Sequence, residues 1–328
     1  MWREIKKALL QHRKFILTTH VNPDGDGIGA ICALTELLIT LQKDVRIVFD
    51  AHPPSKFDFL DYHHLWEVFS PSVNYDETEV VIILDTHKKE RIGRVASVLD
   101  NQQITAICID HHVATETFSQ LTIIDPKACC VGAMVYTLFK ESGCNLNVQA
   151  ATGIYTSVIC DTGRFSHSCT NRKAHKIADE CIKLGVDPDL MYSQIFQHVS
   201  LAEMKMFAKA LQHMETHLDN RVLIQQIFKE DYQDSGSSLD IENMDLEYFN
   251  DFNKQIEEIE CLVLLRELPD SHVRVSLRSK SDLDISSIVK VLGGGGHSKA
   301  AGVTMSGSLS EVKEKILGLL TELLLSKK

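Results

Sequence analysis

The sequence predicts an α/β fold, in which a doubly wound, mostly parallel sheet is followed by a smaller α/β domain. Three observations support this prediction. Near-continuous apolar segments alternate with stretches of helical spacing in the first part of the chain, as in parallel sheets that are covered on both faces. The pattern then changes after about residue 190. The length of 328 residues also favours two domains, because single cores stop growing near ~250–300 residues.

The first domain is predicted to begin with a strand at residues 14–19, whose sequence is apolar and β-prone. A helix follows over 27–41, because Ile28, Ile31 and Leu34 recur at helical spacing. Further strands are predicted at 45–49, 80–84 and 104–109, and further helices at about 130–142, 148–159 and 171–184.

The second domain is predicted to follow a connecting helix over 200–217. Its elements are strands at 221–227, 261–265 and 273–277, a glycine run, and a final amphipathic helix over about 309–326. The predicted division is therefore 1–190 for the first domain, 191–218 for a helical linker and 219–328 for the second domain.

Composition argues against several classes of protein. Hydrophobic residues make up 44% of the chain, which is too many for a disordered protein. No apolar run reaches the ~18 residues of a membrane span, and the N-terminus is typical of an amphipathic helix rather than a signal peptide. The nine cysteines show no Cys-x-x-Cys spacing, and most lie in the apolar contexts of buried free thiols. We therefore expect a cytoplasmic protein with no membrane partner.

The formal net charge of −11 argues against a protein that coats long nucleic acid, since such proteins present an electropositive surface. Any nucleotide ligand should be short, or held by a local basic pocket and by metal ions. The sequence does not decide the oligomeric state, and a homodimer stays open.

Acidic and histidine side chains gather where the predicted strands end, which is where ligand sites form in open parallel sheets. His20, Asp24 and Asp26 follow the first strand. Pro23, with glycines on both sides of Asp26, predicts a tight loop that points these three side chains toward one place. Taken alone, an Asp/Gly-rich turn with a helix cap would be the more common explanation.

Three more segments carry the same kinds of side chain. Asp85 ends the strand at 80–84, Asp110-His111-His112 ends the strand at 104–109, and Asp161 follows a helix of small residues. Taken alone, each of these acidic residues would be explained as a helix cap or a turn residue. Together, however, the four segments supply many carboxylates to one edge of the sheet. Such carboxylates would repel one another strongly without cations.

Oxygen ligands with a minority of imidazole and no cysteine favour two divalent cations of the Mn²⁺ or Mg²⁺ kind. Mn²⁺ is the expected ion, with Mg²⁺ and Co²⁺ as alternatives. Two cations bridged by a carboxylate are the usual device for phosphoryl transfer to water. The sequence therefore predicts a metal-dependent phosphoesterase.

These four segments, in this order, resemble the DHH phosphoesterase superfamily, whose name describes Asp110-His111-His112. The run from Gly293 to Gly296, with His297 after it, is similar to the Gly-Gly-Gly-His signature of the DHH-associated domain. Residues 274–280 are similar to the substrate-binding strand of that domain. The resemblance spans nearly the whole chain and is greatest to the NrnA-like subgroup. These enzymes are nanoRNases that also remove the 3′-phosphate of 3′-phosphoadenosine 5′-phosphate (pAp).

The resemblance implies roles for individual residues. The ligands of one cation would be His20, Asp24 and Asp85, and those of the other would be Asp26, Asp85, His111 and Asp161. Asp85 would thus bridge the two cations and share the catalytic roles with Asp110 and His112. His112 would contact the scissile phosphate, and Asp110 would orient a histidine.

The substrate side of the site is expected on the second domain, with the active site in the cleft between the two domains. In the strand at 273–277, Val273, Val275 and Leu277 alternate with polar residues, so one face packs and the other meets ligand. The substrate-binding residues would be Arg274, Arg278, Gly295, Gly296 and His297, with Arg164 of the first domain as an additional contact. Guanidinium groups suit capture of a phosphate, and glycines allow close backbone approach. Solvated arginines on an edge strand and a flexible glycine loop are the alternative explanations.

The expected function is hydrolysis of short oligoribonucleotides to nucleoside monophosphates and of pAp to AMP, with short RNA, dinucleotides and pAp as substrates. The alternatives are a phosphodiesterase of linear or cyclic dinucleotides, an inorganic pyrophosphatase, and a nucleotide-binding protein without activity. The glycine-histidine domain argues against a pyrophosphatase, which needs no base-reading half.

Overall fold

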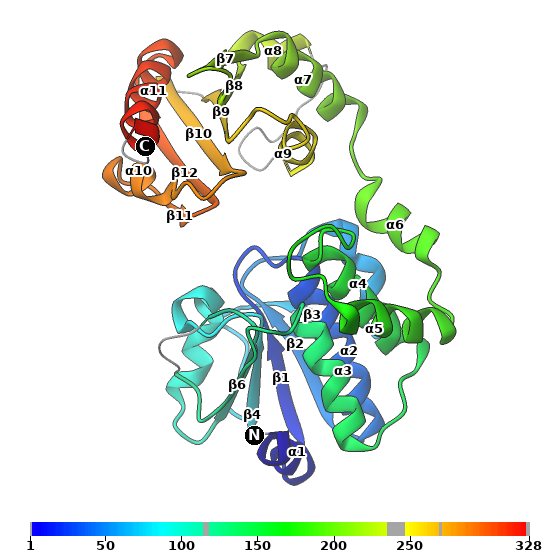
Figure 1. Ribbon diagram of the computed structural model, residues 1–328. Helices are drawn as coiled ribbons and strands as arrows, with labels where there is room; N and C mark the ends of the chain where they lie inside the picture. Colours follow the sequence, from blue (N-terminus) through cyan, green and yellow to red (C-terminus); the bar gives the residue numbers. More distant parts are fainter. Residues whose placement is uncertain (1, 114–117, 235–246, 269–270, 326–328) are drawn as a thin grey trace. The chain divides into compact units, whose positions relative to one another are not determined.

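The computed structural model describes residues 2–113, 118–234, 247–268 and 271–325. The chain divides into two compact units, 1–198 and 199–328, so that the division falls within the stretch predicted as a linker. Figure 1 shows the helices and strands of each unit.

The first unit is built on a six-stranded sheet with the order β3-β2-β1-β4-β5-β6, in which every neighbouring pair is parallel. The predicted doubly wound parallel sheet is therefore confirmed. The strands are β1 (Lys14–Thr18), β2 (Asp44–Phe49), β3 (Trp66–Val68), β4 (Val80–Leu84), β5 (Thr105–Asp110) and β6 (Leu121–Ile124). Edge strands β3 and β6 were not predicted, because three or four residues are too few to show a period.

Helices cover both faces of this sheet. Figure 1 shows α2, α3, α4 and α5 on one side and the cyan segment that includes η2 on the other. Phe15 and Leu17 of β1 pack into the larger core under the α-helices, whereas Ile16 between them packs into the core under η2. Burial on both faces explains why the strands read as continuous apolar runs. The elements are α1 (Trp2–Gln11), α2 (Gly25–Thr40), η1 (Ser55–Leu60), η2 (Lys89–Asp100), α3 (Val131–Ser142), α4 (Val148–Asp161), α5 (Arg172–Lys183) and α6 (Pro188–Phe196).

The strand order reverses at β1, which lies between β2 on one side and β4 on the other. Ligand sites of open parallel sheets form at such a switch point, outside the carboxyl ends of the strands. The ends of β1, β4 and β5 therefore lie side by side at the place where a site is expected.

The second unit also holds a six-stranded sheet, with the order β11-β12-β10-β9-β8-β7. Its pairs are antiparallel except β8 with β9. The strands are β7 (Glu215–His217), β8 (Val222–Ile227), β9 (Cys261–Leu268), β10 (His272–Ser279), β11 (Gly295–His297) and β12 (Ala300–Ser306).

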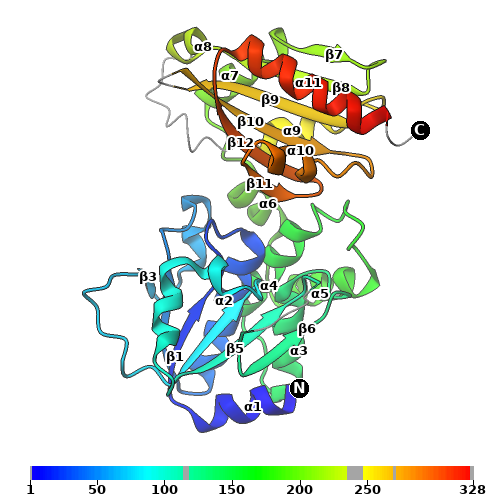
Figure 2. The same ribbon diagram turned by 90° about the vertical axis from the view of Figure 1, so that its left-hand side faces the viewer.

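One face of this second sheet packs against α10 and α11, and Figure 2 shows α11 lying across it. Side chains of α7, α8 and α9 form a separate core against β8 and β9. The helices are α7 (Leu201–Gln212), α8 (Lys229–Asp234), α9 (Glu247–Asn253), α10 (Ser286–Val291) and α11 (Leu309–Leu325). The connecting helix predicted over 200–217 is too long, because residues 215–217 pair with β8 as β7.

None of the helices in the described part of the chain is long and apolar enough to cross a membrane.

Candidate metal centre

The chain leaves β1 into the start of α2, and this junction carries the first group of acidic side chains. Asp24 caps the helix, and its carboxylate accepts from the backbone N–H groups of Asp26 and Gly27 at 3.0 and 3.3 Å. The predicted loop is therefore shorter than expected, and Asp26 lies in the first turn of α2. A Cβ on Gly27 would lie 2.4 Å from Oγ1 of Thr19, so glycine is needed where the helix meets the strand.

Asp26 is buried and held from three directions. The backbone N–H groups of Val131 and Gly132, at the start of α3, donate to its carboxylate at 2.9 and 3.2 Å. The hydroxyl of Ser157 on α4 donates to the same oxygen. The N-terminus of a helix favours negative charge, so α3 and α4 fix this carboxylate with its other side toward the centre.

Asp85, directly after β4, lies at the middle of the group. Its backbone has φ of +63°, which is rare for a residue with a side chain. Its Oδ2 lies 3.4 Å from Nε2 of His20, and its Oδ1 lies 3.7 Å from Nε2 of His111. Asp85 is 2% exposed, and its Oδ1 has no hydrogen-bond partner among the described residues. One buried carboxylate thus faces two different groups of side chains.

Both histidines present the same ring nitrogen to the carboxylates. Nδ1 of His20 lies 2.8 Å from the carbonyl of Val21, and Nδ1 of His111 lies 3.4 Å from the carbonyl of Ala128. A proton on Nδ1 that is donated to a carbonyl leaves the Nε2 lone pair free. This is how histidine ligands of metals are usually oriented.

The side chains converge in two sets that Asp85 links. Asp85 belongs to the first set, and its Oδ1 lies 3.7 Å from Nε2 of His111 in the second. Within each set the candidate ligand atoms lie within 4.8 Å of one another. Nε2 of His111 lies 3.6 Å from Asp26 and 3.7 Å from Asp161, the last residue of α4. The first set is His20, Asp24 and Asp85, and the second is Asp26, His111 and Asp161. A third combination groups Asp85 with His111 and His112.

The carboxylates in these two sets are unfavourable as anions in the absence of cations. Burial, and next the negative charge of Asp161, raise the pKa of Asp26 to about 7. Burial, followed by the charges of Asp26 and Asp24, raises the pKa of Asp85 well above its ordinary value. The protein alone therefore does not stabilise these carboxylates as anions. Oxygen and imidazole donors around an unsatisfied buried oxygen fit divalent cations.

Asp110, the last residue of β5, is fully buried and holds two histidines. Its Oδ1 accepts from Nδ1 of His112 at 2.8 Å, and its Oδ2 lies 2.6 Å from Nδ1 of His87. Burial opposes ionisation of Asp110, but the hydrogen bonds from His112 and His87 outweigh it and lower its pKa to about 2. The same bond to Asp110 raises the pKa of His112. His87 was not predicted from the sequence, where only its place just after Asp85 could have drawn attention.

On the second unit, β10 has the two faces that its alternation predicted. Val273, Val275 and Leu277 are buried, whereas Arg274 is exposed and Arg278 is half-buried. Nη1 of Arg274 donates to Oγ1 of Thr304 on β12 at 3.1 Å, and Nη1 of Arg278 donates to the carbonyl of Leu277 at 3.1 Å. Both guanidinium groups lie on the face that turns away from the core under α11.

The glycine run has two kinds of position. Gly294 and Gly296 are packing positions, since a Cβ there would lie 2.5 Å from the carbonyl of Gly302 and 2.4 Å from that of Ala300. Gly295, between them, has nothing within 4 Å of its ideal Cβ. A ligand can therefore approach the backbone at Gly295. The side chain of His297 lies outside the described part of the structure.

Arg164 lies in the turn after α4, with φ of +60°. Its guanidinium stands 5.0 Å from the ring centroid of Phe196 at the end of α6. This cation–π contact directs the Arg164 side chain toward α6.

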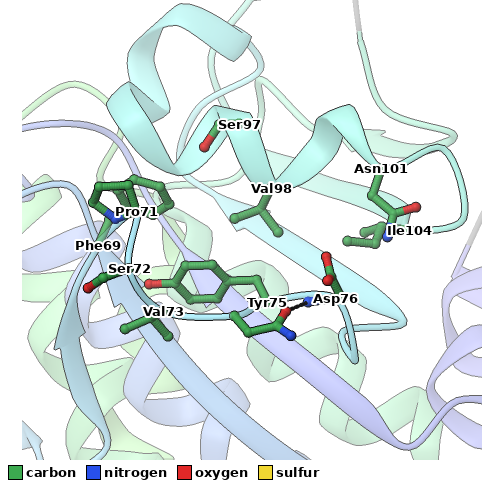
Figure 3. A pocket seen from close by; sticks show the side chains of 11 residues that line it. Phe69, Pro71, Ser72, Val73, Tyr75, Asp76, Ser97, Val98, Asn101 and Ile104 are labelled. Atoms are coloured by element: carbon green, nitrogen blue, oxygen red, sulfur yellow. Dashed lines mark hydrogen bonds between the residues drawn. The ribbon is translucent and has the colours of Figure 1, made fainter.

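A hollow of about 560 Å³ lies elsewhere on the first unit, between the loop after β3 and the end of η2 (Figure 3). Tyr75 and Val98 face each other across it. None of the residues that converge around Asp85 lines this hollow.

Models of known protein families match both parts of the chain. Residues 14–168 match the DHH family, N-terminal domain, and residues 219–325 match the DHHA1 domain. The chain therefore carries a DHH domain followed by a DHHA1 domain. The DHH match contains both sets of side chains around Asp85, and the DHHA1 match contains Arg274, Arg278 and the glycine run.

Several relatives match this DHH protein over nearly its whole length. The bifunctional oligoribonuclease and PAP phosphatase NrnA of Thermus thermophilus is 27% identical over 302 residues, which cover 92% of this chain and 87% of the relative. The protein of the same name from Bacillus subtilis is 28% identical over 312 residues, or 93% of each chain. The cyclic-di-AMP phosphodiesterase GdpP of B. subtilis is 24% identical over 95% of this chain but only 48% of the relative.

The fold of this DHH protein has a solved counterpart. The crystal structure of an exopolyphosphatase-related protein from Bacteroides fragilis superposes with a TM-score of 0.90 at 23% identity, covering 100% of this chain and 97% of the other. This likeness concerns the fold alone.

Proposed function

We propose that this DHH protein is a two-metal phosphoesterase that hydrolyses short oligoribonucleotides to nucleoside monophosphates and pAp to AMP. The observation that carries the proposal is Asp85, a buried carboxylate whose two oxygens face two separate sets of acidic and histidine side chains. The relatives named oligoribonuclease and PAP phosphatase, which align over almost the whole chain, support the substrate class.

In this proposal, His20, Asp24 and Asp85 would hold one cation, and Asp26, His111, Asp161 and Asp85 would hold the other. When bound, the two cations would supply activation of water and neutralisation of the charge that develops on the phosphate. The oxygen-rich donor set favours Mn²⁺, with Mg²⁺ or Co²⁺ as substitutes.

The chain's own residues then bind and orient the reacting groups. His112 donates Nδ1–H to Asp110, and its protonated ring can donate Nε2–H to a phosphate oxygen. The bond to Asp110, which raises the pKa of His112, favours this protonated form. The side chain of His112 is 48% exposed, which leaves room for a substrate. In the hydrolysis, the oxygen of a water forms a new P–O bond and gives up a proton, while the bond to the leaving oxygen breaks and that oxygen takes up a proton. His112 stabilises the charge on the phosphate during this step.

On the DHHA1 domain we propose Arg278 and Arg274 as binding groups for a second phosphate or the neighbouring nucleotide, because both lie on the face of β10 opposite its buried residues. Gly295 and Gly296 would offer backbone N–H donors nearby, and His297 and Arg164 are further proposed contacts. A net charge of −11 disfavours long nucleic acid.

A linear or cyclic dinucleotide phosphodiesterase is the second candidate, favoured by the alignment with the cyclic-di-AMP phosphodiesterase. That alignment covers only 48% of the relative, so it supports the second candidate less strongly than the NrnA alignments support the first.

Product analysis tests the proposal. Metal-stripped protein is given a labelled RNA dinucleotide, a 24-mer, pAp and cyclic di-AMP, each with and without Mn²⁺. We expect mononucleotides from the dinucleotide, phosphate from pAp and slow turnover of the 24-mer, all dependent on Mn²⁺ and lost in Asp85→Ala. Cleavage of cyclic di-AMP alone would transfer the proposal to the second candidate, and no cleavage of any substrate would favour a binding protein.

A further inference from the structure

The turn after β4 carries a histidine across to the neighbouring strand. The backbone N–H of Asp85 still donates to the carbonyl of Ile109 on β5 at 3.1 Å, and the positive φ of Asp85 then turns the chain. Thr86, which is buried, accepts a hydrogen bond at its carbonyl from the thiol of Cys108 at 3.3 Å. The turn therefore has a defined place, and it brings His87 beside Asp110.

Asp110 receives donors on both of its oxygens. Oδ1 accepts from the backbone N–H of His112 at 3.1 Å and from Nδ1 of the same residue at 2.8 Å. Oδ2 is left to Nδ1 of His87 at 2.6 Å. Because an ionised carboxylate only accepts, we assign the proton to Nδ1 in both rings. Asp110 is 0% exposed, so its carboxylate depends on these donors rather than on solvent while both histidines are in place.

We propose that His87 is a positioning residue for the hydrolysis: it holds Asp110 in place and, through Asp110, fixes the ring of His112 that meets the phosphate. The inference rests on the proposed function for its catalytic consequence. Without His87, the buried Oδ2 loses its donor, and the carboxylate is free to rotate about its Cβ–Cγ bond. His112 would then still be hydrogen-bonded to Asp110, but its ring would no longer be held in one orientation.

His87 should act on the reaction and not on cation binding. Among the described residues, it belongs to none of the sets that converge around Asp85. Partners of this kind typically contribute about 10–100-fold to activity, and a misplacement of about 1 Å can cost 10²-fold.

The test compares His87→Asn with His87→Leu, two side chains of similar shape. Asparagine keeps an N–H donor near the position of Nδ1, and leucine removes it. With the Mn²⁺-loaded protein and an RNA dinucleotide, we expect kcat to fall about 10–100-fold in His87→Leu and to recover most of that loss in His87→Asn. The KM and the Kd for Mn²⁺ should stay within about 3-fold of the parent, a difference of less than about 0.7 kcal/mol.

A double substitution separates positioning from general structural damage. If His87 acts through His112, adding His87→Leu to His112→Ala should cost little more than His112→Ala alone. Equal kcat in His87→Leu and the parent, equal losses in His87→Leu and His87→Asn, or fully additive losses in the double variant would each overturn the inference.

Histidine-labelled NMR of the Mg²⁺-loaded protein gives a readout that does not depend on activity. The Nδ1–H resonance of His112 should be sharp and strongly deshielded in the parent and His87→Asn, and broadened in His87→Leu. Identical His112 resonances in all three proteins would refute the positioning role. A parent that hydrolyses neither the dinucleotide nor pAp would instead refute the proposed function, and the NMR comparison would still decide how His112 is held.

Discussion

Nε2 of His20 lies 3.4 Å from Oδ2 of Asp85, while the other oxygen of that carboxylate has no hydrogen-bond partner in the described structure. A buried acceptor without a donor is costly in a folded protein. This arrangement is explained if the carboxylate of Asp85 binds cations.

Replacement of Asp85 should separate stability from activity. In Asp85→Asn, the metal-free protein no longer buries a carboxylate among other acids, so its melting temperature should rise above that of the parent in EDTA. The stabilisation by Mn²⁺ should be lost, and cation-dependent hydrolysis should fall to background. Thermal unfolding with EDTA and with Mn²⁺ measures both effects. Equal stabilisation of both proteins by Mn²⁺ would contradict a bridging role.

The metal-free protein should become less stable as the pH rises from about 4 to 7. The pKa of Asp26 is about 7 in the folded protein, against 3.8 as its ordinary value, and the pKa of Asp85 is also raised. The folded state then binds more protons than the unfolded state between these values, so stability falls with pH. Each pKa unit is worth about 1.36 kcal/mol.

Urea unfolding in EDTA at pH 5 and pH 7.5 measures this dependence, and saturating Mn²⁺ at pH 7.5 should restore the lost stability. Asp26→Asn should show a flatter pH profile in EDTA. A metal-free protein that is more stable at pH 7.5 than at pH 5 would show that the carboxylates are already neutralised by other groups.

Removal of the Ser157 hydroxyl should weaken the second cation position. Ser157 donates to Asp26 and accepts from the backbone N–H of Gly132 at 2.8 Å, so Ser157→Ala leaves Asp26 less well oriented. We expect Mn²⁺ affinity or activity to drop about 10–100-fold. Ser97→Ala is the matched control, because Ser97 is exposed and its hydroxyl donates to the carbonyl of Arg94. Similar Mn²⁺ titrations for the two variants would count against the role of Ser157.

Loss of Arg278 should affect substrate binding and leave the cations in place. A charged hydrogen bond is worth about 1.5–3 kcal/mol, so Arg278→Ala should raise KM for pAp roughly 10–100-fold with an unchanged Kd for Mn²⁺. Lys315→Ala removes the same charge from α11, which packs on the opposite face of the sheet, and should behave as the parent. If both variants raise KM equally, only the overall charge matters.

The sequence was most informative where acidic and histidine residues directly follow a predicted strand. His20, Asp24, Asp85 and His111 could be placed together, because parallel strands bring their carboxyl ends to one edge. Asp161 ends helix α4, so the strand ends alone do not explain its place beside them. Asp26 also lies beside these side chains, although it is in the first turn of a helix rather than in a loop.

Contacts that depend on backbone geometry could not be predicted. His87 reaches Asp110 because Asp85 adopts a positive φ, and the sequence pattern does not indicate this backbone conformation. Ser157 lies in the middle of α4 among small residues and becomes a partner of Asp26 only through the packing of α4 on α2. The same holds for β7, whose three residues continue a helical pattern and form a strand only by pairing with β8.

The most direct test of a bridged cation pair is electron paramagnetic resonance of the metal-stripped protein titrated with Mn²⁺. We predict two Mn²⁺ ions per chain, with the spectrum of an exchange-coupled pair that disappears in Asp85→Asn. Binding of a single ion, or of two ions with uncoupled spectra, would contradict the account.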